Sequence, residues 1–297
     1  MKKLLFFGLL LALLSCGSFF RKVEKIDRYQ VGHSIEIDGR IRKYIVKTPN
    51  NYNSKKKYPL LLVFHGARGN PIDMQKITGF NKLADREDLI VVYPFGTTAD
   101  EKQGFFWNAW ECCGYALQHE VDDIRFVKKL ISILKEDYSI ESGRVYATGF
   151  SNGGMLSLRL ACEASEEFAA IASVGGAMFH ENCIPSVPIS IFLIQGKKDR
   201  VVPIEGGVGK NSSTVSPKLP SFQTFQFWSK KNHCERQRST ETSNLITYEA
   251  LDCKTKNTVK MVIVKDEEHS WPEKNYPTSE EIWKFLNKWT KYNKYPT

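Results

Sequence analysis

The sequence lacks several features that would indicate particular classes of protein. It contains no repeat of fixed period, no low-complexity tract and no long linker, which favours one domain over an array of repeats or tethered modules. It also contains no nucleic-acid-binding motif, and its basic residues are scattered among acidic ones. We therefore assign the formal net charge of +9 to a solvated surface and not to a nucleic-acid interface.

Beyond residue 15, the chain has no apolar stretch that approaches the roughly 20 residues of a membrane-spanning helix. The first fifteen residues combine Lys2 and Lys3 with an apolar run over residues 4–14, a pattern typical of an export signal. Residues 13–16, Leu-Leu-Ser-Cys, resemble a bacterial lipoprotein cleavage site and predict lipidation of Cys16. An ordinary secretory signal is the alternative. Membrane contact is expected only through this lipid anchor.

These observations divide the chain into three parts. We expect residues 1–15 to be a lipoprotein-type signal peptide, residues 16–30 an N-terminal tether and residues 31–297 a single catalytic domain. Removal of the first 15 of the 297 residues leaves 297 − 15 = 282, which is enough for one large α/β domain with a sizeable core. The sequence predicts no particular oligomeric state.

Seven cysteines become six once Cys16 is set aside. They lack the paired Cys-x-x-Cys or Cys/His spacings of a zinc site, so we expect no metal site. An even set in an exported chain fits disulfides, and we favour a bond between Cys162 and Cys183. A second bond between Cys234 and Cys253 would close a segment of about twenty residues. The remaining two, Cys112 and Cys113, either bond to each other or stay reduced.

Short apolar runs alternate with helical patterns along the chain. Runs typical of strands buried on both faces of a parallel sheet occur at residues 60–64, 89–93, 144–148, 169–174, 189–194 and 259–264. Candidate helices lie between or after them, at residues 81–87, 123–137, 153–163, 221–231 and 279–291. This alternation predicts an α/β fold with a mostly parallel, doubly wound sheet.

Two other segments have distinct patterns. Residues 33–37 and 41–48 flank Asp38-Gly39-Arg40, which predicts an antiparallel hairpin at the start of the domain. Residues 206–220 are rich in loop-forming residues. In a doubly wound sheet the ligand site lies beyond the carboxyl ends of the strands, so chemistry is expected in residues that follow each apolar run.

The strongest such place is Gly149-Phe150-Ser151-Asn152-Gly153, between a predicted strand and a predicted helix. This is the context of a nucleophile elbow, in which small neighbours let strand and helix approach while the serine hydroxyl stays accessible. The alternative is a structural Gly/Ser turn. With the strand and helix in place, we predict that Ser151 is a nucleophile.

A serine hydroxyl needs a base within hydrogen-bond reach and a third group that orients the base. In α/β-hydrolases these follow the serine in the order Asp or Glu, then His, each after a strand. His269 follows the run that ends at residue 264 and is the predicted base. The other histidines considered as the base are His33, His119, His180 and His233. None of them follows a predicted buried strand.

Asp199 is the predicted acid, because it follows the run that ends at residue 194. Asp266 and Glu268 lie too near His269 in the chain to reach its Nδ1 atom with good geometry. The pair Asp122-Asp123 is expected mainly to start a helix, where carboxylates cap the backbone and favour the helix dipole.

An oxyanion hole is also required, since the tetrahedral intermediate carries negative charge on the former carbonyl oxygen. We predict that one donor is the backbone N–H of Asn152, directly after the nucleophile. The other is the N–H of Ala67, within His65-Gly66-Ala67-Arg68-Gly69 after the first buried strand. The alternative for this segment is a glycine turn without function.

Several motifs occur together in one order: His65-Gly66, Trp107-Asn108, Cys112-Cys113-Gly114, Val121-Asp122-Asp123, residues 149–155 and His269-Ser270-Trp271-Pro272. Together they resemble the polyhydroxybutyrate depolymerase-type esterases, which are related to family 1 carbohydrate esterases such as feruloyl and acetylxylan esterases. The resemblance extends over residues 41–289. It implies an α/β-hydrolase fold and secreted, cofactor-free hydrolysis of an ester substrate.

When the roles of family residues are transferred by motif position, the resemblance implies that Ser151, Asp199 and His269 form the catalytic triad. It also implies that Trp107 and Trp271 lie near the substrate cleft. Core packing or a surface anchor is the alternative for both tryptophans. The chain lacks the substrate-binding module and Thr-rich linker of polymer-degrading members. We therefore expect soluble oligomeric hydroxyalkanoate esters, or feruloyl and acetyl esters of plant polysaccharides, to react through an acyl-enzyme.

Two other classes of function are compatible with the same scaffold. A serine peptidase would use the same triad, although 282 residues leave no room for the large gating domain common in such enzymes. A non-catalytic, carbohydrate-binding surface lipoprotein would have lost its chemistry. Such proteins usually lose a triad residue first, and here all three are present.

Overall fold

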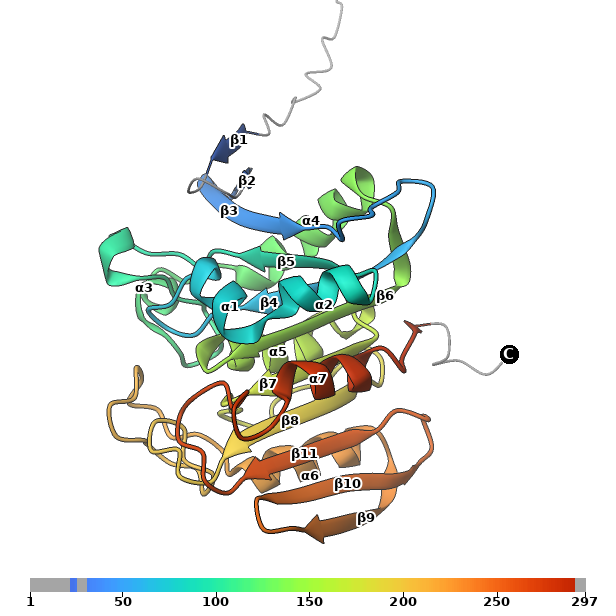
Figure 1. Ribbon diagram of the computed structural model, residues 1–297. Helices are drawn as coiled ribbons and strands as arrows, with labels where there is room; N and C mark the ends of the chain where they lie inside the picture. The colour runs from blue at the N-terminus through green and yellow to red at the C-terminus, as the bar shows by residue number, and fades with distance from the viewer. Residues whose placement is uncertain (1–21, 26–30, 292–297) are drawn as a thin grey trace, which may run out of the picture.

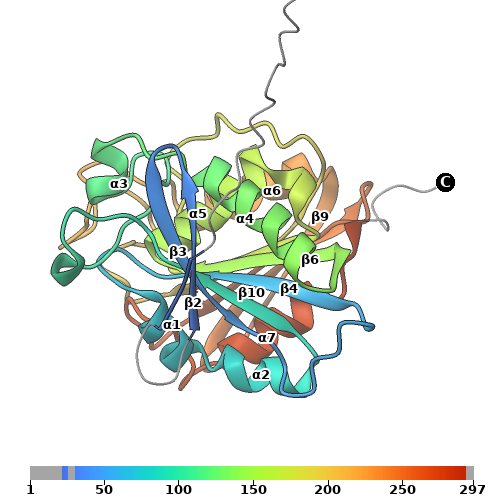
Figure 2. The same cartoon turned by 90° about the horizontal axis from the view of Figure 1, so that it is seen from above.

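The computed structural model describes residues 22–25 and 31–291 of the chain. These residues form one eleven-stranded mixed sheet with the strand order β1-β2-β3-β5-β4-β6-β7-β8-β11-β10-β9. Helices cover both faces of this sheet (Figures 1 and 2). The signal peptide predicted for residues 1–15 and the predicted lipidation site Cys16 lie outside the described residues.

The first three strands form an antiparallel edge of the sheet. They are β1 (Lys22–Lys25), β2 (Val31–Ile37) and β3 (Arg40–Lys47). Asp38 and Gly39 connect β2 to β3 with positive φ angles of 51° and 68°, the combination that a tight two-residue hairpin turn requires. The predicted hairpin is therefore confirmed. Strand β1 falls within the segment predicted as a tether and pairs with β2, so the sheet begins earlier than expected.

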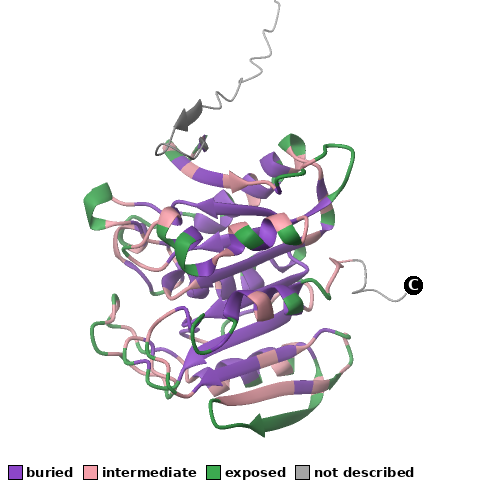
Figure 3. Ribbon diagram, in the orientation of Figure 1, coloured by how far each residue is buried: buried purple, intermediate pink, exposed green. Residues whose placement is uncertain are grey.

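The centre of the sheet is parallel. It contains β4 (Tyr58–Phe64), β5 (Ile90–Pro94), β6 (Ile140–Phe150), β7 (Ala170–Val174), β8 (Ser190–Gly196) and β11 (Val259–Val264). Every residue of β4, β5, β7 and β8 is buried, as their continuous apolar runs predict. Figure 3 shows these buried strands between partly exposed helices.

Each face of the sheet has its own hydrophobic core. Leu60 and Leu62 pack on one face under α4 (Asp123–Asp137), α5 (Asn152–Glu163) and α6 (Ser221–Lys231). Leu61 and Val63 pack on the other, because successive strand residues point to opposite faces. That second face is covered by α1 (Pro71–Thr78), α2 (Phe80–Arg86) and α7 (Thr278–Leu286).

The helix predictions are mostly confirmed, with two kinds of difference. The last helix ends at Leu286 and not at residue 291, so its predicted end is wrong. Short elements were not predicted, namely α1, α3 (Gly114–Gln118), η1 (Glu101–Gln103) and η2 (Ser165–Glu167). The interval 206–220 contains no helix or strand beyond a single bridge between Gly207 and Lys218, as its composition predicts. None of the described helices combines the length and apolarity needed to cross a membrane.

A second antiparallel edge follows α6. It consists of β9 (Cys234–Glu241) and β10 (Leu245–Cys253), which pairs with β11. Figure 3 shows β9 as the exposed edge of the sheet. A disulfide between Cys234 and Cys253 joins the ends of the two strands.

Both favoured disulfides are confirmed. The bond between Cys162 and Cys183 ties α5 to the segment after β7. Cys112 and Cys113 are bonded to each other, which is one of the two states expected for this pair. The described cysteines are therefore all paired, and each bond links residues that are near in sequence.

Candidate active site

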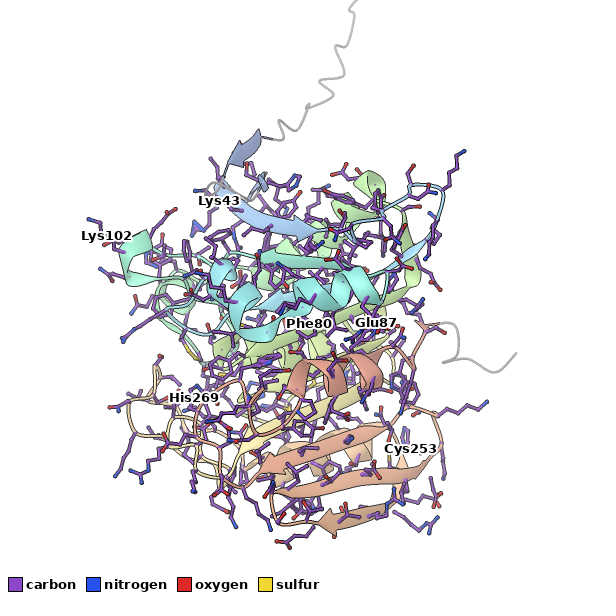
Figure 4. All side chains as sticks on the ribbon, viewed as in Figure 1. Lys43, Phe80, Glu87, Lys102, Cys253 and His269 are labelled. Atoms are coloured by element: carbon purple, nitrogen blue, oxygen red, sulfur yellow. A yellow bond between two sulfur atoms is a disulfide. The ribbon has the colours of Figure 1, made fainter. Side chains whose placement is uncertain are left out.

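The predicted catalytic residues meet at the carboxyl edge of the parallel strands. Ser151 directly follows β6, Asp199 lies three residues after β8 and His269 lies on the loop after β11. Figure 4 labels His269 at the edge of the sheet where these loops gather. Residues that are 118 and 70 positions apart in the chain thus become neighbours.

Ser151 occupies a strained turn between β6 and α5. Its backbone has φ 54° and ψ −118°, a conformation that non-glycine residues rarely adopt. Gly153 permits this turn, because a Cβ atom there would lie 2.4 Å from the Phe64 carbonyl oxygen at the end of β4. The geometry is that of a nucleophile elbow, with the positive end of the α5 dipole directed at the serine.

His269 connects Ser151 to Asp199. Its Nε2 atom lies 2.8 Å from Ser151 Oγ, and its Nδ1 atom lies 2.6 Å from Asp199 Oδ2. The Phe150 ring packs against the imidazole with a centroid distance of 4.9 Å. A proton on Nδ1 would bind the carboxylate and leave Nε2 free to accept the serine proton, which is the arrangement of a Ser-His-Asp triad.

Asp199 is nearly buried, with 1% of its side chain exposed, and its charge is met by several donors. The backbone N–H groups of Val201 and Val202 both donate to Oδ1 at 2.8 Å. Gln195 Nε2 donates to Oδ2 at 3.0 Å. Charge-assisted hydrogen bonds of this kind stabilise a buried carboxylate and fix its direction. Asp199 is therefore oriented to hold the imidazole.

The two alternative acids are directed elsewhere. Asp266 is 72% exposed, and its carboxylate binds Lys198 Nζ at 2.9 Å. Glu268 is also exposed. Among the carboxylates weighed from the sequence, the structure brings only Asp199 into hydrogen-bond contact with His269.

The loop that contains Ala67 lies beside the elbow. A Cβ atom added to its neighbour Gly66 would stand 3.3 Å from Ser151 Cβ. The hydrogen bonds within residues 22–25 and 31–291 include none from the backbone N–H of Ala67 or of Asn152. Asn152 is the first residue of α5, where N–H groups have no partner within the helix. Both amides are thus free to bind an oxyanion.

The structure places both tryptophans of the resemblance in the core. Trp107 is completely buried, and its Nε1 donates to the His65 carbonyl oxygen at 3.0 Å. Trp271 is 7% exposed, and its Nε1 donates to Ser279 Oγ at 3.1 Å. The structure therefore supports the packing alternative for both rings and does not support their contact with substrate.

Sequence reasoning missed a buried ion pair behind the site. Arg42 Nη2 donates to Asp123 Oδ1 at 2.6 Å, and the Asn108 N–H donates to Asp123 Oδ2 at 2.7 Å. Burial raises the pKa of Asp123, and the Arg42 charge opposes this shift. Asp122 caps α4 as expected by accepting from the Arg125 N–H, whereas Asp123 anchors the segment that contains Trp107.

Sequence reasoning also missed the role of His65, which it treated only as part of a glycine-containing loop. This histidine is 1% exposed, and burial lowers its pKa to about 4. The position of His65 directly before Gly66, after a predicted buried strand, was the sequence feature that could have indicated its role.

A large groove exists elsewhere on the molecule. It measures about 1300 Å³ and is lined by the β2–β3 turn and by polar residues of α4 and α5. Its lining includes no triad residue, so it gives no information about the reaction. In the part of the chain that the structure describes, no group of three or more His, Cys, Asp or Glu side chains is arranged to hold a metal ion.

The mixed sheet with helices on both faces and the Ser-His-Asp geometry at its carboxyl edge are typical of the α/β-hydrolase fold. A model of the family described as "Putative esterase" matches residues 35–275. The chain belongs to this esterase family.

Two curated relatives are named as a feruloyl esterase and as an acetylxylan esterase/xylanase. Feruloyl esterase B of Piromyces equi is 30% identical over 224 residues, which cover 72% of this chain and 40% of the relative. The bifunctional acetylxylan esterase/xylanase XynS20E of Neocallimastix patriciarum is 28% identical over 242 residues, which cover 78% of this chain and 31% of the relative. The chain thus spans less than half the length of these two relatives.

Solved structures confirm the fold. An acetyl xylan esterase from Aspergillus awamori superposes with a TM-score of 0.60 at 15% identity, over 83% of this chain and 94% of that one. A thermostable esterase superposes with a TM-score of 0.54 at 18% identity, over 92% of this chain and 63% of that one. At such identities the likeness concerns the fold alone.

Proposed function

We propose that this protein is an exported serine esterase that cleaves feruloyl or acetyl esters of plant polysaccharides through an acyl-enzyme on Ser151. The observation that carries the proposal is the hydrogen-bonded line from Ser151 Oγ through His269 to Asp199, with distances of 2.8 and 2.6 Å. This line supplies a nucleophile, a base and an orienting carboxylate in direct contact with one another.

In the acylation step, Ser151 Oγ attacks the ester carbonyl carbon while His269 Nε2 takes the hydroxyl proton. The carbonyl oxygen becomes an oxyanion, which the N–H groups of Ala67 and Asn152 bind. Collapse of this intermediate breaks the bond to the alcohol oxygen. The imidazolium gives its proton to that oxygen, the alcohol leaves, and the acyl group remains on Ser151.

In the deacylation step, water takes the place of the alcohol. His269 removes a proton from the water, and the resulting hydroxide attacks the acyl carbon. The second tetrahedral intermediate uses the same two donors. Its collapse returns the proton to Ser151 Oγ and releases the carboxylic acid, so one water is consumed for each ester cleaved.

The substrate class is proposed from the relatives, whose names specify feruloyl and acetylxylan esters. Export is proposed from the amino-terminal sequence and from the three disulfides, since disulfides persist in oxidising compartments. The intact triad geometry argues against a binding protein that has lost its chemistry. Soluble hydroxyalkanoate oligomers are included among the substrates to be compared.

The test is side-by-side hydrolysis of p-nitrophenyl acetate, methyl ferulate, acetylated xylan, hydroxybutyrate oligomers and a peptide amide. We expect kcat/KM to be highest for methyl ferulate or acetylated xylan and negligible for the amide. Ser151→Ala should lower the rate of ester cleavage about 10⁶-fold, whereas Ser229→Ala, which removes a hydroxyl bonded within α6, should not change it. Absence of ester cleavage by the wild-type protein, or faster cleavage of the amide, would contradict the proposal.

A further inference from the structure

A path of hydrogen bonds joins the two predicted oxyanion donors through the core. It begins at the Asn152 side chain, whose Oδ1 accepts from the Trp107 N–H at 2.8 Å and whose Nδ2 donates to the Trp107 carbonyl oxygen at 3.1 Å. The path continues through the indole, since Trp107 Nε1 donates to the His65 carbonyl oxygen at 3.0 Å. Asn152, Trp107 and His65 are each no more than 1% exposed.

The His65 imidazole extends the path to the second donor. The Gly96 N–H donates to His65 Nε2 at 3.0 Å, so this nitrogen is an acceptor and carries no proton. The ring proton is therefore on Nδ1, which lies 2.7 Å from the Gly66 carbonyl oxygen and donates to it. Burial lowers the pKa of His65 to about 4, so the ring is neutral at pH 7 and keeps this tautomer.

These contacts determine the direction of the Ala67 N–H. The Gly66 carbonyl oxygen also accepts from the Gly69 N–H at 3.0 Å, so two donors hold it on one side. The carbonyl of Gly66 and the N–H of Ala67 belong to one planar trans peptide and point in opposite directions. Fixing the oxygen therefore fixes the N–H. Gly66 lies against Ser151, which places this peptide at the nucleophile.

We infer that Trp107 and His65 are positioning residues that fix the two oxyanion donors relative to each other. The inference rests on the proposed function, because it concerns the same intermediate. A tetrahedral oxygen is stabilised best when both donors are already aimed at it, since no reorganisation is then needed during the reaction. Trp107 connects the peptide on one side of Ser151 to the helix start on the other, and neither residue contacts the substrate.

The aromatic ring and the hydrogen bond of Trp107 can be separated by substitution. Trp107→Phe keeps an aromatic ring in the core but removes the donor to the His65 carbonyl. Trp228→Phe is a matched control, because Trp228 is also fully buried and its Nε1 has no partner among the described residues. Both changes remove a similar volume, so a difference between their effects on activity measures the contribution of the hydrogen bond.

The first measurement is the steady-state hydrolysis of p-nitrophenyl acetate. Loss of a whole oxyanion donor costs about 10²- to 10³-fold in kcat, so a misdirected donor should cost less. We expect Trp107→Phe to lower kcat about tenfold with KM unchanged within about twofold, and Trp228→Phe to change neither. A residue with a merely structural role would not, when replaced, lower kcat in a folded protein while leaving KM unchanged.

His65 provides a second pair of variants. His65→Leu removes the donor to the Gly66 carbonyl and should lower kcat about 10²-fold. His65→Asn retains an N–H donor near the position of Nδ1 and should recover most of this loss. Circular dichroism and thermal melting establish that each variant is folded. If His65→Leu does not fold, Trp107→Phe and its control Trp228→Phe still decide the question.

The second measurement is inhibition by phenylboronic acid, which forms a tetrahedral adduct with the serine and places an oxygen in the oxyanion hole. The inhibition constant should rise in Trp107→Phe by about the factor by which kcat falls, because both the boronate adduct and the reaction depend on the two donors. Folded Trp107→Phe with kcat and boronate affinity within about twofold of wild type would overturn the inference.

The esterase mechanism and the positioning role of Trp107 and His65 fail under different outcomes. If Ser151→Ala is inactive while folded Trp107→Phe and folded His65→Leu both behave as wild type, the esterase mechanism stands and the positioning role is lost. If the wild-type protein neither hydrolyses esters nor binds the boronate, the proposed function itself fails and the inference fails with it.

Discussion

The two halves of the proposed active site hold their reactive atoms in different ways. In the acid–base half, the working groups are side chains on loops, and His269 keeps 16% of its side chain exposed. In the oxyanion half, the working groups are backbone amides, and they are braced by Trp107 and His65, which are buried in the core. Groups that transfer protons need access to substrate and water, whereas donors that stay still benefit from a rigid, dry surrounding.

The same difference between the two halves is seen in the hydrogen-bond partners of His269 and His65. His269 has a carboxylate on one nitrogen and a hydroxyl on the other, so it can gain and lose a proton during the reaction. His65 has a backbone N–H on one nitrogen and a backbone carbonyl on the other, so protonation would break a hydrogen bond. In the proposed mechanism, one histidine acts by changing its charge and the other by remaining neutral.

The largest expected effect concerns the acid–base half. Ser151→Ala and His269→Ala should each lower kcat about 10⁶-fold, and the double variant should fall little further, because the triad acts as a unit. The residual rate would come from substrate binding and the oxyanion hole. Steady-state hydrolysis of p-nitrophenyl acetate by the three variants measures this. Additive losses would show that the two residues act independently and would contradict a triad that acts as a unit.

A smaller effect is expected at the orienting acid. Asp199→Asn should lower kcat about 10⁴-fold, since the imidazole remains but its tautomer and developing charge lose support. Asp266→Asn is the matched control, because Asp266 pairs with Lys198 at the surface. It should change kcat less than about twofold. If the two outcomes are exchanged in the same assay, the acid of the triad is Asp266.

The contrast between the histidines predicts a pH dependence of stability. The pKa of His65 is about 4 in the folded protein, against an ordinary histidine pKa of 6.5 in the unfolded chain. Below pH 6.5 the unfolded chain therefore binds a proton that the folded protein does not, and stability is lost as pH falls from 6.5 to 4, by about 3 kcal/mol from this residue. Urea unfolding at about pH 7 and about pH 4 should show that wild type loses about this much more free energy than His65→Asn. Equal losses would contradict the buried, neutral state of His65.

The smallest expected effect concerns the tryptophan on the acid–base side. Trp271 donates to Ser279 at the start of α7, so Trp271→Phe should lower the free energy of unfolding by about 1 kcal/mol. It should leave kcat and KM within about twofold of wild type, in contrast to the tenfold loss of kcat in Trp107→Phe. A rise in KM of more than about tenfold with methyl ferulate would restore the assignment of Trp271 to substrate binding.

The triad residues and the central strands could be predicted from the sequence. Ser151, Asp199 and His269 each follow a run of buried apolar residues, and their chemistry requires particular side chains in a particular order. Their positions could therefore be predicted from the sequence. The central strands could be predicted for the same reason, because β4 and β8 are buried on both faces and contain few polar residues.

The rest depends on tertiary contacts that leave little trace in the sequence. Trp107 occupies a motif position that suggests a substrate cleft, and only the packing around Asn152 and His65 shows that its indole is a buried donor. Strand β9 is polar and exposed along nearly its whole length, so it has no apolar pattern. Its pairing with β10 and the bond between Cys234 and Cys253 hold it in the sheet.

The central claim is that Ser151 forms an acyl-enzyme with the two halves of the site acting on the same intermediate. Rapid acid quenching of the protein with p-nitrophenyl acetate, followed by peptide mass spectrometry, tests this directly. We predict one acetyl group on the peptide that contains Ser151, and no such group in the Ser151→Ala protein. An acetyl group on a different residue, or continued turnover by folded Ser151→Ala protein, would contradict the claim.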